Sequence, residues 1–368
     1  MSASPKDAKS SPANAEAVLI VPGDPDQPTG GYRYDAHIVE ELRALGWSID
    51  VVGLPGRFPE ADDPAREALD HVLGARRDGS IAIVDGLALG GLPEVAARHA
   101  GRLHLVGLIH HPLADETGLS DSARDRFERT ERQALAACRR VVTTSLFTAR
   151  RVEAMGVARR RIGVVEPGVE TAEAAGDPVR AAERRRQRLL CVGSLTPRKG
   201  QDLLIEALAR LLDDDWRLEL VGDPARDPDF SARLQRRVAV LELSDRIRFN
   251  GACTTVELDR IYRNADLVVV PSHYEGYGMV VTEALARGLP LIATTGGALA
   301  DTVPEQGAWR VAPGDTAALA AALQRWFDHP EQRLELVRGA LSVRRQLSGW
   351  RQAGRRFASE LTRISVTA

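Results

Sequence analysis

The chain has 368 residues, which at about 100–200 residues per domain predicts two domains. Hydrophobic residues make up 44% and charged residues 27%, as in ordinary globular proteins, and no apolar run approaches the ~18 residues of a membrane-spanning helix. A net charge of -2 gives no reason to expect a nucleic-acid partner, and membrane contact should be peripheral at most. Cys138, Cys191 and Cys253 lack CxxC spacing, so we expect buried thiols in a reducing compartment, the cytoplasm.

The N-terminal segment, residues 1–16, is rich in Ser, Pro and Ala and lacks the apolar core of a secretory signal, so we expect a disordered tail. A strand is predicted at Ala17–Val21. Next come a loop, the pair Gly30-Gly31, and a helical pattern from Tyr32 to Leu45.

Strand Ser48–Val52 completes a βαβ unit, in which the two glycines would let the chain approach a ligand at the helix start. A tight turn without a ligand is the alternative. The loop is not GxGxxG, which disfavours a dinucleotide site.

Two histidines follow the strand predicted at Leu103–Ile109. His110 and His111 would lie at the carboxyl edge of a parallel sheet, where ligands bind in such folds. One structural and one solvent-facing histidine is the alternative. Strands and helices keep alternating through Val169, and this alternation predicts a doubly wound parallel sheet.

A second α/β region is predicted after an aperiodic linker at residues 170–188. Strand Leu189–Val192 leads into the loop GSLTPRKG, which contains Arg198 and Lys199. A guanidinium fork beside a compact ammonium suits a pair of phosphates. The alternative is two surface cations on a turn. The loop is not a Walker motif, because no GKS or GKT follows the glycines.

The segment PSHYEGYGMVVTEALARGLP, residues 271–290, lies between apolar runs predicted as strands, and its second half is predicted to be helical. Glu275 and Glu283 lie eight positions apart around this strand-to-helix corner. A helix start attracts anions, whereas carboxylates bind hydroxyl groups. Together with the cations of the preceding loop, the corner predicts a ligand with both phosphates and hydroxyls, a nucleotide-sugar.

Two DxD patterns, Asp24-Pro25-Asp26 and Asp227-Pro228-Asp229, invite a metal-site interpretation. Their prolines and short contexts favour turn chemistry. We therefore expect no metal site and no cofactor.

Together these motifs resemble the family 4 glycosyltransferases, which have the GT-B fold of two facing Rossmann-like domains. The resemblance runs from Val18 onward, and its most specific part is the Glu-x7-Glu pair. VGSLTPRKGQDLLIEAL resembles the family's phosphate loop, and GGYRYDAHIVEELRALGWSIDVVGLP its N-terminal Gly-Gly loop and helix. Leu299 and Ala300 depart from the Pro and Glu that often follow the later Gly-Gly.

The resemblance implies an acceptor domain at 17–169, a donor-binding domain at 189–343, and a last helix, within 344–368, that returns to the N-terminal domain. It implies that Arg198 and Lys199 hold the donor diphosphate and stabilise the leaving group. It implies that Glu283 binds the ribose and Glu275 the transferred sugar. His110, or His111 in the alternative register, would approach that sugar. The further donor-binding positions that it implies are Gly30, Gly31, Gly276, Tyr277, Gly278, Met279 and Val280.

By this resemblance we expect a hexosyltransferase-type glycosyltransferase that retains anomeric configuration without a metal. Its donor would be a UDP-, GDP- or ADP-sugar, and its acceptor a small molecule, a lipid-linked compound or a glycan. A nucleotide-sugar epimerase of the same architecture and a non-catalytic nucleotide-sugar-binding protein are the alternatives. A dehydrogenase is the weakest rival.

Overall fold

The computed structural model describes residues 15–170, 172, 184–211 and 214–366. Residues 1–14 of the predicted tail lie outside these ranges, as do residues 171 and 173–183 of the predicted linker. None of the described helices is both long and apolar enough to cross a bilayer.

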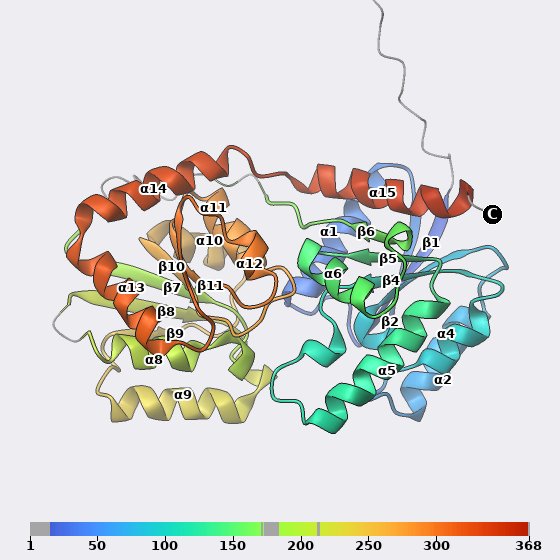
Figure 1. The fold of residues 1–368 in the computed structure, drawn as a ribbon, viewed down its shortest axis with the longest axis horizontal. Helices are drawn as coiled ribbons and strands as arrows, with labels where there is room; N and C mark the ends of the chain where they lie inside the picture. Colours follow the sequence, from blue (N-terminus) through green and yellow to red (C-terminus); the bar gives the residue numbers. More distant parts are fainter. Residues whose placement is uncertain (1–14, 171, 173–183, 212–213, 367–368) are drawn as a thin grey trace, which may run out of the picture.

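Two parallel six-stranded sheets stand side by side (Figure 1), with strand orders β2-β1-β3-β4-β5-β6 and β12-β11-β10-β7-β8-β9. The strands are β1 (Glu16–Pro22), β2 (Ser48–Leu54), β3 (Ile81–Asp85), β4 (His104–Ile109), β5 (Arg140–Thr143), β6 (Ile162–Val164), β7 (Gln187–Val192), β8 (Trp216–Val221), β9 (Ile247–Phe249), β10 (Leu267–Val270), β11 (Leu291–Thr294) and β12 (Ala308–Val311). This confirms the predicted class of two doubly wound α/β domains.

Helices cover both faces of each sheet. Alternate strand residues point to opposite faces, so each face has a hydrophobic core of its own beneath the helices. Val18 and Ile20 of β1 join one core, and Leu19 and Val21 join the other. The helices are α1 (Gly30–Ala44), α2 (Asp63–Gly74), α3 (Gly86–Leu89), α4 (Pro93–His99), α5 (Asp121–Ala137), α6 (Leu146–Ala154), α8 (Gln201–Leu208), α9 (Pro228–Val240), α10 (Thr255–Asn264), α11 (Met279–Ala286), α12 (Leu299–Thr302), α13 (Thr316–Asp328), α14 (Pro330–Arg344) and α15 (Trp350–Val366).

The last two helices connect the domains. Figure 1 shows α14 against the C-terminal domain and α15 lying across the N-terminal domain. Trp350, Phe357 and Leu361 are buried on one stripe of α15, in the core that also contains Leu42 of α1. The predicted return of the last helix to the N-terminal domain is therefore confirmed.

Three expectations need correction. Helix α1 begins at Gly30, not Tyr32, because the first N–H groups of a helix need no partner within it and glycine is tolerated there. The apolar pattern after the phosphate loop predicts a helix over Gln201–Leu212, but helix α8 ends at Leu208. Cys138 and Cys191 are buried free thiols as expected, but Cys253 is only partly buried.

Candidate functional site

A cleft of about 870 Å³ separates the two domains at the carboxyl ends of their strands. The N-terminal domain lines it with the start of α1 and the segments after β3 and β4, and the C-terminal domain with the segments after β7 and β10. All the residues singled out from the sequence line this cleft: Gly30, Gly31, His110, His111, Arg198, Lys199, Glu275, Gly276, Tyr277, Gly278, Met279, Val280 and Glu283.

Two glycines shape the corner between β10 and α11. Gly278 has a φ of 90°, and a Cβ atom here would lie 2.6 Å from Leu299 Cδ2. Gly276 lies against the other domain, where a Cβ atom would overlap the carbonyl oxygen of His110. The Thr148 hydroxyl also donates to the Gly276 carbonyl oxygen at 3.3 Å. The domains therefore approach backbone to backbone beside the cleft.

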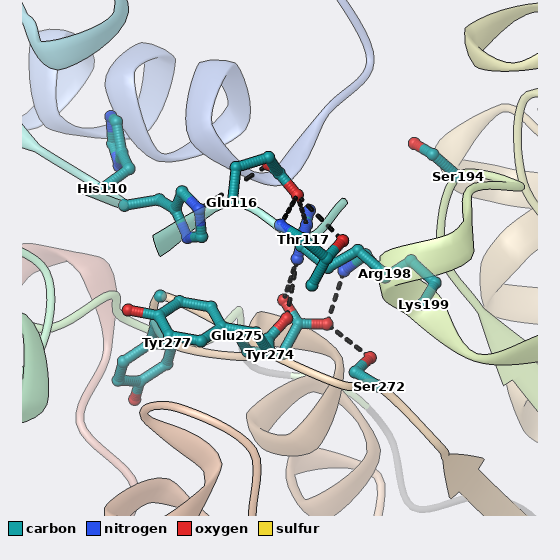
Figure 2. Close-up of polar contacts among 12 residues, drawn as sticks. His110, Glu116, Thr117, Ser194, Arg198, Lys199, Ser272, Tyr274, Glu275 and Tyr277 are labelled. Carbon is teal, nitrogen blue, oxygen red and sulfur yellow. Dashed lines mark hydrogen bonds and ion pairs between the residues drawn. The ribbon is translucent and has the colours of Figure 1, made fainter. Parts of the chain in front are cut away.

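The buried Glu275 is the centre of a charge cluster whose two cations, Arg198 and Lys199, are partly exposed to the cleft. Its Oε1 accepts hydrogen bonds from Lys199 Nζ at 2.6 Å and from Ser272 Oγ at 2.7 Å, and its Oε2 lies 3.3 Å from Arg198 Nη1 (Figure 2). Burial opposes ionisation, yet the two cations lower the pKa of Glu275 to about 2. Two cations around one carboxylate leave a net positive charge, which can bind an anion.

Arg198 also reaches the N-terminal domain. Its Nε lies 3.4 Å from Glu116 Oε1 of that domain, while its Nη1 donates to the carbonyl oxygen of Tyr274 in its own domain at 2.8 Å (Figure 2). The Tyr274 hydroxyl donates to Asp115 Oδ2 at 2.8 Å, and Asp115 also pairs with Arg151. These partners could not be predicted from the sequence, because no motif connects Glu116 or Asp115 to the phosphate loop.

Glu283, eight residues further along, lies at another part of the cleft. Tyr262 donates its hydroxyl to Glu283 Oε2 at 2.9 Å, and Arg33 Nη1 of α1 lies 3.1 Å from Oε1. Arg33 was missed by the sequence analysis, although it follows the Gly-Gly pair by two positions. A second carboxylate is thus fixed by one partner from each domain.

His110 lies between two buried carboxylates of the N-terminal domain. Its Nε2 is 3.0 Å from Asp35 Oδ1 and 3.6 Å from Asp85 Oδ2. Burial lowers the pKa of His110, but these carboxylates outweigh burial and raise it. The ligand-type atoms of the three residues lie within 4.8 Å of one another. Neither carboxylate was predicted; Asp85 ends a strand before Gly86, and that position was the available signal.

His111 has the opposite electrostatics. Burial and then the charge of Arg198 lower its pKa to about 4, so the neutral imidazole is favoured. Both histidines line the cleft and lie near carboxylates, but at His111 burial and Arg198 outweigh the carboxylates, whereas at His110 the carboxylates outweigh burial.

Asp35→Asn is expected to lower the pKa of His110, because the variant loses the carboxylate that accepts from Nε2. The measurement is an NMR titration of the His110 imidazole. Asp70→Asn, which removes the carboxylate beside His99, is the matched control and should leave His110 unchanged. An identical His110 titration in Asp35→Asn would contradict this account of its charge.

The segment that follows the histidines is fixed by Glu131 of α5. The Leu113 N–H lies 3.1 Å from both carboxyl oxygens of Glu131, whose side chain is buried. Burial raises the pKa of Glu131 to about 8, from a usual 4.5. A raised folded-state pKa contributes stability that is fully present below pH 4.5 and is lost as pH rises through about 8.

Glu131→Gln is therefore expected to flatten the decline of unfolding free energy between pH 6 and pH 9 and to be the more stable protein at pH 9. Urea unfolding across this range measures the effect. Glu128→Gln on the same helix, where the glutamate side chain is 42% exposed, should follow the wild type. A wild-type slope in Glu131→Gln would refute the assignment.

The two DxD patterns form turns and caps, as predicted. Asp24 Oδ1 accepts from the Asp26 N–H at 2.9 Å, and Asp227 Oδ1 accepts from the Phe230 N–H at 2.9 Å, at the start of α9.

Two facing Rossmann-like domains around a cleft, joined by a returning C-terminal helix, define the GT-B class of glycosyltransferase folds. The model of "Glycosyltransferase Family 4" matches residues 28–173, and that of "Glycosyl transferases group 1" matches residues 177–342. The chain belongs to the family 4 glycosyltransferases.

Curated relatives carry the name D-inositol 3-phosphate glycosyltransferase. The protein of Acidothermus cellulolyticus is 37% identical over 232 residues, 58% of this chain and 50% of the relative. That of Pseudarthrobacter chlorophenolicus is 31% identical over 280 residues, 73% of this chain and 65% of the relative. The chain spans about half the length of the first of these relatives.

Solved structures share the fold at low identity. Sucrose-phosphate synthase from Thermosynechococcus elongatus superposes with a TM-score of 0.79 at 21% identity, over 96% of this chain and 100% of that one. HepE from Anabaena in complex with UDP-glucose gives 0.74 at 17% identity, over 94% and 99%.

Proposed function

We propose that the protein transfers a glycosyl group from a nucleotide-diphosphate sugar to an acceptor hydroxyl. The observation that carries the proposal is the cluster of Arg198 and Lys199 around the buried Glu275, in the same cleft as Glu283. Family membership supports it, as does the likeness in fold to HepE, which was solved in complex with UDP-glucose.

In this reaction the bond from the anomeric carbon to the diphosphate oxygen breaks, a bond from that carbon to the acceptor oxygen forms, and the proton of the acceptor hydroxyl passes to the departing diphosphate. Arg198 and Lys199 bind the diphosphate and stabilise the charge that develops as it departs. Glu283 accepts hydrogen bonds from ribose hydroxyls. Glu275 orients the two cations and contacts the transferred sugar with its remaining lone pairs.

His110 lies on the opposite wall from these groups, next to Gly31, and we propose that it contacts the transferred sugar. The backbone of Gly276 to Val280 assists in donor binding. Retention of configuration, independence from metals and a cytoplasmic location are part of the same proposal, as expected from the family resemblance and the cysteines.

A thermal-shift screen of UDP-, GDP- and ADP-sugars tests donor binding first. A donor at 100 times its dissociation constant should stabilise the protein by about 2.7 kcal/mol. Release of nucleoside diphosphate that depends on an acceptor then tests transfer. If an isomerised sugar forms without an acceptor, the protein is an epimerase and not a transferase. If a donor binds but no acceptor is turned over, the protein is a nucleotide-sugar-binding protein.

A further inference from the structure

The wall of the cleft opposite the donor cations is formed by the N-terminal domain. We call the segments Asp85–Leu87 and Glu116–Gly118 the acceptor wall, because donor groups are assigned to the other side. Figure 2 shows Glu116 and Thr117 facing Arg198 and Lys199 across the cleft. The charges on this wall bear on the chemistry of the acceptor, so an inference from them rests on the proposed function and deepens it.

The ionised groups of the acceptor wall are carboxylates. Asp85 and Glu116 both line the cleft. Among the described N-terminal-domain residues that line it, Arg33 is the one arginine or lysine, and its guanidinium is 3.1 Å from Glu283. The positive charge of His110 is offset by Asp35 and Asp85 on either side.

The cations on the opposite wall of the cleft, Arg198 and Lys199, are already paired with carboxylates. Lys199 and Arg198 share Glu275, and Arg198 has Glu116 on its other side, 3.4 Å from Nε. Once a donor diphosphate binds these two cations, it brings negative charge of its own next to the acceptor wall. A second phosphate, on the acceptor, would then meet carboxylates and the diphosphate together.

Arg226 is the remaining cation that lines the cleft within the described chain. It is exposed at the rim, where its Nη1 donates to Gln27 Oε1 at 3.2 Å. The neighbouring Asp227 lines the same rim. Because Arg33, Arg198 and Lys199 are paired with carboxylates, we expect a phosphorylated acceptor to bind Arg226, and this residue provides the critical test.

Other features of the acceptor wall suit an uncharged ring. Carboxylates and the Thr117 hydroxyl accept hydrogen bonds from hydroxyl groups. Leu87 of α3 is 39% exposed and lines the cleft, so it can pack against the C–H face of a sugar or cyclitol.

We propose that the acceptor is a neutral polyhydroxylated compound, a sugar or cyclitol without a phosphate, whose hydroxyls donate to Asp85 and Glu116. The acceptor wall acts against phosphorylated acceptors by like-charge repulsion. This chain would thus differ in acceptor charge from the relatives whose names include inositol 3-phosphate.

The test uses the full chain and a donor identified by thermal shift. Paired acceptors are compared by kcat/KM: myo-inositol with D-inositol 3-phosphate, and glucose with glucose 6-phosphate. The neutral member of the productive pair should be preferred by about tenfold or more. Leu87→Lys, which adds a cation to the wall, should shift this ratio toward the phosphorylated member, whereas Leu87→Gln should not.

Preference for a phosphorylated acceptor in the wild type would overturn the inference while leaving the transferase proposal intact, and loss of that preference in Arg226→Gln would identify Arg226 as the phosphate-binding group. An unchanged ratio in Arg226→Gln is expected instead. Because each ratio is taken within one variant, altered folding or donor affinity cancels. Absence of any donor-induced thermal shift would overturn the proposed function itself, a result separate from the acceptor ratio.

Discussion

Lys199→Ala is expected to lower kcat for glycosyl transfer by about 10²–10³-fold, the range found when one preorganised charge-stabilising group is removed from an active site. Lys199 Nζ lies 2.6 Å from Glu275 at the edge of the cleft, so it is held in place before any ligand arrives. The effect should be largest on kcat, because charge on the diphosphate increases as the glycosidic bond breaks.

Acceptor-dependent release of nucleoside diphosphate measures this effect. Arg185→Ala is the matched control, because Arg185 is an exposed cation outside the cleft lining and its loss should leave kcat unchanged. A kcat for Lys199→Ala within about threefold of the wild type, far below the loss expected for a charge-stabilising group, would remove Lys199 from the catalytic machinery.

Glu275→Ala is expected to abolish measurable transfer and also to destabilise the fold. The structure shows Glu275 buried against Arg198 and Lys199. Removing one partner of a fully buried ion pair typically costs about 3–5 kcal/mol. The loss here should be smaller, because Arg198 and Lys199 remain partly exposed to solvent.

The low pKa of Glu275 makes its contribution to the unfolding free energy depend on pH. Its folded-state pKa of about 2 lies below the usual 4.5, so its stabilising contribution is present above pH 4.5 and is lost as pH falls through about 2. The difference in unfolding free energy between wild type and Glu275→Gln should be constant above about pH 5 and should shrink on acidification. Glu305→Gln, at an exposed position, is the control and should show no such difference. A difference independent of pH down to about 2 would contradict the ion-pair account.

The sequence was sufficient wherever local patterning decides the structure. Strands β4 and β7 end at the predicted residues, Ile109 and Val192, because in each an apolar run is followed directly by loop-forming residues. The corner around Glu275 and Glu283 was also recognised, since its glycines, carboxylates and apolar flanks lie within one short segment.

The sequence was insufficient where pairs form across the cleft. Arg33 reaches Glu283 from 250 positions away, and Asp35, Asp85 and His110 come from three separate elements. No spacing rule relates such residues, because tertiary packing sets their distance. Asp35 was difficult to predict for a further reason. It is buried next to Tyr34 in α1, where a carboxylate is unexpected.

The contact at Gly276 has a consequence for engineering. Because its missing side chain is what allows the two domains to meet at the His110 carbonyl oxygen, a single methyl group there would set a minimum separation between them. Gly276→Ala therefore adds one methyl group at a point where the two domains are in backbone contact. A lower kcat in Gly276→Ala would show that turnover requires the two domains to approach this closely at Gly276.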